Sequence, residues 1–330
     1  MTSASPRSQY ESTVAVNRRL CREHYLLDVH LPEFPPTAPG QFIQIACRDL
    51  EIGDSPSPES EWSQEKPLIL TGEELSGPLA LIRRPFSLAG RIDKSDGVHL
   101  QLIHRVVGVG TDWLGDLKVD DTVGIIGPLG NRFTLPNPGQ PAILVGGGVG
   151  IPPMIYLAQA LSGFSALAIC GVTTADLLPL TRLAPPDIEP TLCIQEFANH
   201  GIPSLIATDD GSLGMKGYVT QALERYLDKL PTPPPGTLGE GRGEGLLPSG
   251  INPIIYTCGP EIMMKRVAAI AMERGLECQV AVERAMACGM GTCQSCVIRV
   301  KTSGRTDGRT WVYRLACTDG PIFRGGDLLW

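Results

Sequence analysis

Short apolar runs alternate with polar or turn-forming segments from Tyr10 to about Thr134. Five of these runs are STVAVNRRL, YLLDVHL, QFIQIAC, HLQLIHRVV and DTVGIIG. Runs of this kind, separated by Pro- and Gly-rich breaks, are typical of antiparallel β-strands. A barrel or sandwich of about six strands is the simplest architecture that buries their apolar sides. We therefore predict an antiparallel β-barrel domain over residues 1–138.

After Gln140 the pattern changes to strands that alternate with helices. A buried strand and glycine turn, PAILVGGGVG, precede IPPMIYLAQAL, whose apolar residues have helical spacing. Further strands are expected at FSALAICGV, TLCIQEF and NPIIYTCG, and further helices at YVTQALERYLDKL and PEIMMKRVAAIAMERG. Alternation of this kind predicts a doubly wound parallel sheet. We place this α/β domain at residues 139–276.

Two stretches interrupt this organisation without an apolar period. The first, from Arg48 to Gly77, is polar, acidic and contains proline, and the second is the Pro/Gly-rich segment 231–250. Segments of this composition bury too little apolar surface to order themselves, so we expect surface loops there. From Glu277 onward short strands return around a group of cysteines. This change predicts a small third domain over residues 277–330.

Composition narrows the classes of function. The chain has 330 residues, 42% of them hydrophobic, and a formal net charge of −7. Nucleic acids and anionic membrane surfaces normally attract basic patches, so we expect neither as a partner. The opening MTSASPRSQY has no apolar stretch behind a basic start. We therefore predict no signal peptide and no membrane span.

Cysteine spacing is the most specific chemical signal in the chain. The run AMACGMGTCQSCVIRV places Cys288, Cys293 and Cys296 as C-x4-C-x2-C, and Cys317 follows. This is the plant-type spacing of a 2Fe-2S cluster, and the intervening glycines let the backbone curl around inorganic sulfide. Zinc sites usually pair two CxxC knuckles, and disulfides need an oxidising compartment, so both alternatives fit less well. The other six cysteines lie in apolar or strand-like segments, which is typical of reduced cytosolic thiols.

Two motifs in the barrel half suit a flavin nucleotide. Each offers an arginine for phosphate, the first adds a hydroxyl group, and the second is followed by a glycine turn that opens the expected helix TDWLGDL. The first amides of such a helix suit a pyrophosphate. Either motif alone could be a surface loop, but their occurrence together favours FAD. The candidate residues are Arg84, Pro85, Phe86, Ser87, Ile103, His104, Arg105, Gly110 and Thr111.

Two strand-to-helix turns in the α/β half suit a nicotinamide nucleotide. GGGVGIPP follows a strand and opens a helix, although its last glycine falls early for a GxGxxG fingerprint. CGP ends another strand and starts another helix. Ligands of parallel sheets bind at the carboxyl ends of the strands, where both turns would lie. The candidate residues are Gly147, Gly148, Gly150, Cys258, Gly259 and Pro260.

This constellation resembles the ferredoxin reductase-like flavoproteins, and more closely the electron-transfer subunits of the class 1B dihydroorotate dehydrogenases. Those subunits carry the same motifs in the same order. Here they continue with DDGSLGMKG, Glu283 and a terminal Cys317-Thr318-Asp319-Gly320-Pro321-Ile322-Phe323. The resemblance spans nearly the whole chain and is most specific at the C-terminus. The insertions at about 48–77 and 231–250 and a longer gap before Cys317 depart from it.

The resemblance implies three cofactors: FAD at the two barrel motifs, a 2Fe-2S cluster on the four cysteines, and NAD. It implies a partner, an FMN-containing dihydroorotate dehydrogenase catalytic subunit, in a cytoplasmic heterotetramer that serves pyrimidine (UMP) biosynthesis. Electrons from dihydroorotate would pass through the cluster and FAD to NAD+. A flavin is needed there because a nicotinamide takes a hydride, whereas the cluster passes single electrons. The chain has no room for a further TIM barrel of ~250 residues, so we expect no dihydroorotate oxidation without the partner.

Several alternatives remain open at the level of sequence. An NAD(P)H:ferredoxin or sulfide-type oxidoreductase subunit has the same three modules, and a non-enzymatic cluster-based redox sensor is a third, weaker hypothesis. Cys258 is equally explained as a nicotinamide contact or as a buried strand end, and His104 as a flavin contact or a barrel residue. The five histidines show no metal-ligand spacing. NAD is favoured over NADP because GVTTADLL lacks an arginine for a 2′-phosphate.

Overall fold

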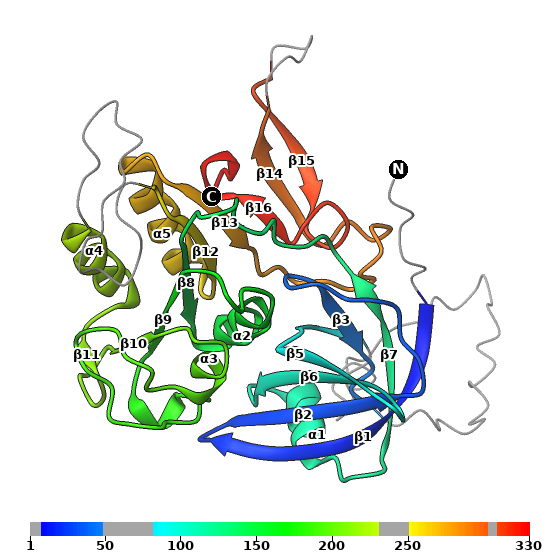
Figure 1. Cartoon of the computed structure of the whole chain (residues 1–330). Helices are drawn as coiled ribbons and strands as arrows, with labels where there is room; N and C mark the ends of the chain where they lie inside the picture. Colours follow the sequence, from blue (N-terminus) through cyan, green and yellow to red (C-terminus); the bar gives the residue numbers. More distant parts are fainter. Residues whose placement is uncertain (1–7, 49–81, 231–250, 303–308) are drawn as a thin grey trace, which may run out of the picture.

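The computed structural model describes residues 8–48, 82–230, 251–302 and 309–330. These residues form two seven-stranded sheets and a two-stranded hairpin. Figure 1 shows the two sheets side by side, and the hairpin projects next to the C-terminal strand of the second sheet. The two insertions expected near 48–77 and 231–250 lie outside the described residues, apart from Arg48. Within the described ranges, no helix is both long and apolar enough to cross a bilayer.

The first sheet, called the barrel sheet below, is antiparallel throughout, as predicted. Its strand order is β4-β3-β7-β1-β2-β6-β5. Alternate residues of β2 and β6, such as Leu27, Val29, Leu100 and Leu102, fill one core. The described strands exceed the expected number because RPFS and GRIDK pair as short strands of their own. The elements are β1 (Ser8–Cys21), β2 (His24–Leu31), β3 (Phe42–Ile45), β4 (Arg84–Ser87), β5 (Gly90–Lys94), β6 (Gly97–Arg105), α1 (Val109–Asp116) and β7 (Thr122–Leu129).

The second sheet is parallel except at one edge, with the order β11-β10-β9-β8-β12-β13-β16. Successive residues of β8 face opposite cores: Ile143 and Val145 pack with α4 and α5, and Leu144 packs with α2 and α3. Helices therefore cover both faces, which confirms the doubly wound prediction. The elements are β8 (Ala142–Gly147), α2 (Ile151–Ala160), β9 (Ala166–Val172), α3 (Gln195–Ala198), β10 (Ser204–Thr208), β11 (Met215–Lys216), α4 (Val219–Lys229), β12 (Ile254–Cys258), α5 (Glu261–Glu273), β13 (Glu277–Ala281) and β16 (Ile322–Arg324).

One predicted strand was wrong. TLCIQEF contributes only two isolated bridges, Arg182 to Ile194 and Thr191 to Ser204, and then enters α3, while the sheet strand beside β9 is the later β10. A short apolar run does not by itself distinguish a strand from a buried helical turn. In α3, Phe197 is fully buried while Glu196 stays outside the core, which one helical turn allows.

The last part of the chain leaves the parallel sheet and returns to it. The boundary predicted at residue 277 falls directly before β13, and β13 and β16 pair antiparallel at the sheet edge. Between them lie the four candidate cysteines and the hairpin of β14 (Val297–Lys301) and β15 (Trp311–Leu315). This cysteine lobe, residues 282–321, is thus an excursion between two neighbouring strands.

Candidate functional site

A cleft of about 800 Å³ lies between the barrel sheet, α1 and the carboxyl ends of the parallel strands. It brings together residues from the two predicted flavin motifs and from the two predicted nicotinamide turns. Those that line it are Arg84, Pro85, Phe86, Ser87, Ile103, His104, Arg105, Gly110, Thr111, Gly150, Cys258 and Gly259. Gly147, Gly148 and Pro260 do not line it. They lie in or beside the turns that shape its wall.

The first turn of α1 can accept an anion. The early N–H groups of a helix have no helical acceptor, and Val109 and Gly110 both line the cleft. Thr111 stabilises the turn: its Oγ1 accepts hydrogen bonds from the N–H groups of Val107 at 2.9 Å and Gly108 at 3.2 Å. The helix dipole adds to this preference for negative charge.

Two arginines border the same cleft. Arg105 is held by Glu23, whose carboxylate accepts from Nε at 2.8 Å and lies 2.7 Å from a terminal nitrogen. Arg84 is exposed and donates to the carbonyl of Ile82 at 3.0 Å through one terminal nitrogen. Its remaining N–H groups can therefore face a phosphate in the cleft, and a guanidinium binds phosphate in a bidentate manner.

His104 is a barrel residue that also lines the cleft. Its ring stacks on Tyr25 at 5.7 Å and meets Phe86 edge-on at 6.2 Å. It is 2% exposed, and neither ring nitrogen has a hydrogen-bond partner among the described residues. Orphaned buried polar atoms are unusual in folded proteins. They fit a site that receives hydrogen bonds from a bound nucleotide.

Burial of His104 makes the stability of the flavin-free chain depend on pH. Burial lowers the pKa of His104 to about 4, with a smaller contribution from His24, against an ordinary value near 6.5. Between these values the folded state binds fewer protons than the unfolded state, so stability is lost as pH falls. From pH 7 to about pH 5 we expect His104 to contribute a loss on the order of 2 kcal/mol. Urea unfolding of wild type and His104→Phe at both pH values checks this, and an equal loss in the variant would contradict it.

The two glycine turns of the α/β half pack against each other. A Cβ on Gly150 would lie 2.2 Å from the carbonyl carbon and oxygen of Cys258. A Cβ on Gly147 would lie 2.4 Å from Sδ of Met263 in α5. The backbones at the ends of β8 and β12 can approach this closely only without side chains. The glycines thus bring two strand ends to one cleft.

Cys258 is both buried and at the cleft, so the two sequence interpretations of this thiol are compatible. It ends β12 and is 9% exposed. Burial raises the pKa of Cys258 to about 12, and the nearby Glu283 carboxylate adds to this effect. The group is therefore a neutral thiol at physiological pH.

One wall of the cleft was missed by sequence reasoning. Residues 281–286, the last residue of β13 and the five that follow it, also line the cleft. Within this segment, Arg284 forms an ion pair with Glu261 at the start of α5. Only Glu283 had been considered as a site residue. Its position after a parallel strand was the available signal, because ligands bind at such strand ends.

The four cysteines form two pairs. The Cys288 sulfur accepts N–H groups from Met290 at 3.5 Å and Cys293 at 3.4 Å. Burial raises the pKa of the Cys317 thiol to about 12, and the neighbouring Cys296 thiol adds to this effect. Cys296 and Cys317 are 1% exposed, whereas Cys293 is exposed. Two thiol pairs are the donor set that two irons need.

The cysteine loop is fixed to the barrel sheet. Gln44 of β3 is fully buried and donates through Nε2 to the carbonyl oxygens of Met286 at 3.5 Å and Ala287 at 3.3 Å. Gly289 has φ +70, and a Cβ there would lie 2.7 Å from the Gln44 side-chain oxygen. The loop backbone therefore wraps closely, as a cluster of inorganic sulfide requires. The donor set and this fold of the loop both fit a 2Fe-2S group.

The side chain of Asn131 ties the C-terminal motif to the end of β7. Asn131, which follows β7, donates through Nδ2 to the carbonyl oxygens of Asp319 at 3.0 Å and Ile322 at 2.9 Å. Its side-chain oxygen accepts the Ile322 N–H at 2.8 Å. Cys317 is thereby placed from the barrel side and from the edge strand β16 together.

Comparisons with known proteins agree with this architecture. A family model described as the iron-sulfur cluster binding domain of dihydroorotate dehydrogenase B matches residues 283–329. Among solved structures, the chain is similar to one of an NADH-dependent reduced ferredoxin-NADP oxidoreductase, with a TM-score of 0.67 and 24% identity over 100% of this chain and 92% of that one. The likeness confirms a ferredoxin reductase-like fold.

Curated relatives match over almost the full chain. The electron transfer subunit of dihydroorotate dehydrogenase B (NAD(+)) from Desulforamulus reducens is 31% identical over 93% of this chain and 92% of its own length. The protein of the same name from Geobacillus sp. is 30% identical over 97% and 98%. The chain therefore belongs to the family of electron transfer subunits of dihydroorotate dehydrogenase B.

Proposed function

We propose that this chain passes electrons from an FMN-containing dihydroorotate dehydrogenase catalytic subunit through a 2Fe-2S cluster and FAD to NAD+. The observation that supports this best is the segment from Ala281 to Cys288. It lines the nucleotide cleft up to Met286 and reaches the first cluster cysteine two residues later. One continuous wall therefore serves both redox sites.

The FAD site in this proposal uses both barrel motifs. Arg84 and Arg105 neutralise phosphate, Ser87 offers a hydroxyl group, and the backbone N–H groups of Gly110 and Thr111 donate to the pyrophosphate. A bound flavin would take single electrons from the cluster and pass them on in pairs, as a hydride, to NAD+. Phe86 and His104 close the apolar side of the cleft, which excludes water from it.

The nicotinamide nucleotide in this proposal binds over Gly147, Gly148, Gly150 and the turn Cys258-Gly259-Pro260. The Cys258 thiol is neutral and polarizable. It can therefore contact the nicotinamide ring both in its positively charged oxidised form and in its neutral reduced form. NAD is proposed over NADP because the turn after β9 carries Asp176 and no arginine of its own. Arg22, which the fold brings to this turn, is paired with the Asp176 carboxylate at 3.1 Å.

Cys288, Cys293, Cys296 and Cys317 would hold the cluster. The exposed side of Cys293 gives the partner subunit an approach to it. We further propose a heterotetramer in the cytoplasm, within pyrimidine synthesis. Support for the compartment comes from the six cysteines outside the cluster set, since all six are free thiols and persist as such in reducing surroundings.

Optical and EPR spectra of the anaerobically purified chain test the assignment. We expect flavin bands, a reducible 2Fe-2S signal, and NAD+ reduction that requires dihydroorotate and the catalytic subunit. NADH reduction of both cofactors without coupling to that subunit would move the assignment to a ferredoxin or sulfide-type reductase. Absence of NADH:dye activity would instead leave a redox sensor.

The phosphate role of Arg84 gives a direct prediction. Removing a hydrogen bond to a charged group costs about 1.5–3 kcal/mol, so Arg84→Gln should weaken FAD binding by about 10- to 100-fold. Flavin fluorescence released on dilution measures the dissociation constant. Arg18→Gln, on the exposed face of β1, is the matched control and should retain wild-type affinity. Equal FAD retention by both variants would remove Arg84 from the site.

A further inference from the structure

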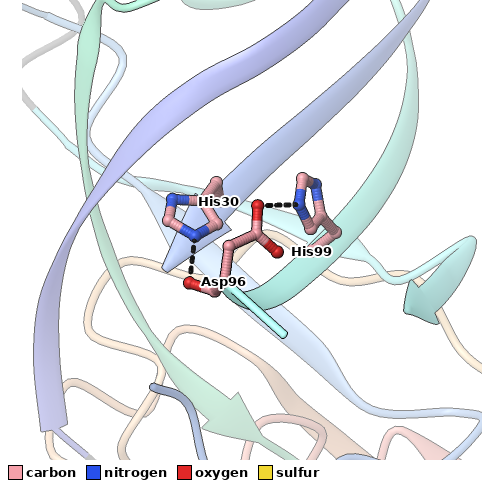
Figure 2. Close-up of side chains that lie close together, drawn as sticks. All are labelled: His30, Asp96 and His99. Atoms are coloured by element: carbon pink, nitrogen blue, oxygen red, sulfur yellow. Dashed lines mark hydrogen bonds and ion pairs between the residues drawn. The ribbon is translucent and has the colours of Figure 1, made fainter. Parts of the chain in front are cut away.

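Two histidines and an aspartate meet at one end of the barrel sheet, and none of the three lines the cleft. His30 of β2 and His99 of β6 are direct cross-strand partners, and Asp96 lies in the β5–β6 turn. One ligand atom from each of the three lies within 4.8 Å of the others. Figure 2 shows the Asp96 carboxylate facing His99, while the ring of His30 faces the backbone carbonyl of Asp96. No sequence spacing indicates this, because the strand register creates it.

His99 is oriented like a metal ligand. Its Nδ1 lies 2.7 Å from the buried carboxylate of Asp28, which also accepts from Gln101 at 3.2 Å. Because Asp28 is an acceptor, Nδ1 carries the proton and Nε2 keeps its lone pair. His99 is 6% exposed, and Nε2 is buried without a hydrogen-bond partner among the described residues. A carboxylate behind a histidine is the usual support of a coordinating imidazole.

The other two residues complete a three-ligand set. The Asp96 carboxylate lies 3.9 Å from His99 Nε2, and its side chain is 62% exposed. His30 stays close because its Nε2–H donates to the Asp96 carbonyl at 2.9 Å, a hydrogen bond that a metal ion bound at this nitrogen would replace, and the two imidazole rings are 5.2 Å apart. Gly97 permits this turn: it has φ +142, and a Cβ there would lie 2.8 Å from His30 Nε2. The site is buried on the His99 side and open to solvent on the Asp96 side.

We propose that His30, Asp96 and His99 bind a divalent transition metal ion, with Zn2+ as the natural occupant. Two imidazoles and one carboxylate favour zinc over magnesium or calcium, which prefer oxygen ligands. Water takes the remaining position on the exposed side. Asp28 is a positioning residue for His99. A bound ion joins β2 to the β5–β6 turn and so stabilises the folded barrel sheet.

Zinc binding to the cluster-loaded protein tests this proposal. The sample is equilibrated with Zn2+, dialysed, and analysed for zinc and iron together, so that zinc on vacant cluster cysteines is recognised by missing iron. We expect about one zinc per chain at full iron content, and a rise in melting temperature on zinc addition. His30→Gln and Asp96→Asn, both at accessible positions, should each lower zinc affinity at least about tenfold and abolish the thermal shift.

Two further variants sharpen the test. Asp28→Asn should lower zinc affinity by about 10- to 100-fold while all three ligands remain. His200→Gln, in the turn after α3 and outside the site, is the matched control and should bind zinc as wild type does. The proposal is overturned if iron-loaded wild type binds no zinc, or if His30→Gln and Asp96→Asn bind it as tightly as wild type. Loss of zinc in His200→Gln would likewise show binding elsewhere.

Discussion

Cys296→Ser is expected to remove the cluster and reduce partner-dependent NAD+ reduction to the rate seen without the partner. Cys296 and its neighbour Cys317 are both 1% exposed, so the Cys296 thiol belongs to the buried pair of the donor set. Iron–sulfur clusters are held by thiolates, and a serine hydroxyl group leaves one iron without its ligand. EPR of the reduced protein and iron content measure the loss. NADH:dye reduction should persist, because the nucleotide cleft does not contain Cys296.

The control for this experiment is Cys21→Ser. Cys21 ends β1, is only partly buried, and lies outside both the cleft and the cysteine lobe. It should keep wild-type iron content and wild-type coupling to the partner. If Cys296→Ser retained partner-dependent NAD+ reduction, the cluster would not lie on the electron path. That result would contradict the cluster step of the proposed function and leave the flavin step unaffected.

Gly150→Ala should cause the largest loss of stability among single methyl additions at the site. The new Cβ would lie 2.2 Å from the carbonyl carbon of Cys258 and 2.3 Å from the amide nitrogen of Gly259. Both contacts are with backbone, so one strand end has to move. Overpacking of this kind costs about 3 kcal/mol. Urea unfolding measures the loss, and the KM for NADH should rise because the moved turn belongs to the proposed nucleotide site.

Gly115→Ala provides a matched comparison. Gly115 lies in α1, and a Cβ there would be 3.5 Å or more from the nearest atoms, which is ordinary contact. Alanine favours a helix over glycine by about 1 kcal/mol, so this variant should be no less stable than wild type. If Gly150→Ala unfolded at the same urea concentration as Gly115→Ala, the close approach of β8 and β12 would not constrain the sheet.

The sequence predicted those features that depend on local chemistry. The cysteine spacing, the two arginine motifs and the glycine turns each carry their signal within a few residues, and the structure places most of them around one cleft. The resemblance to the family then linked motifs that no spacing rule connects. The doubly wound sheet followed from the alternation of strands and helices.

Features that depend on pairing between distant segments were not predictable. The site formed by His30 and His99 arises from the register of β2 against β6, and nothing near either residue encodes that register. The return of β16 to the edge of the parallel sheet is of the same kind. The mistaken strand at TLCIQEF shows the remaining limit, since a short apolar run fits a strand or a buried turn equally well.

The excursion between β13 and β16 has a mechanical consequence. Neighbouring strands are about 4.8 Å apart, so the lobe of residues 282–321 starts and finishes at adjacent points on one rigid edge. Gln44 and Asn131 attach it a third and a fourth time from the barrel side. A lobe anchored in this way cannot swing on a single hinge. The separation between its thiols and the nucleotide cleft is therefore set by the sheet edge, so the distance between a cluster held by these thiols and a flavin bound in the cleft would not depend on how the partner subunit docks.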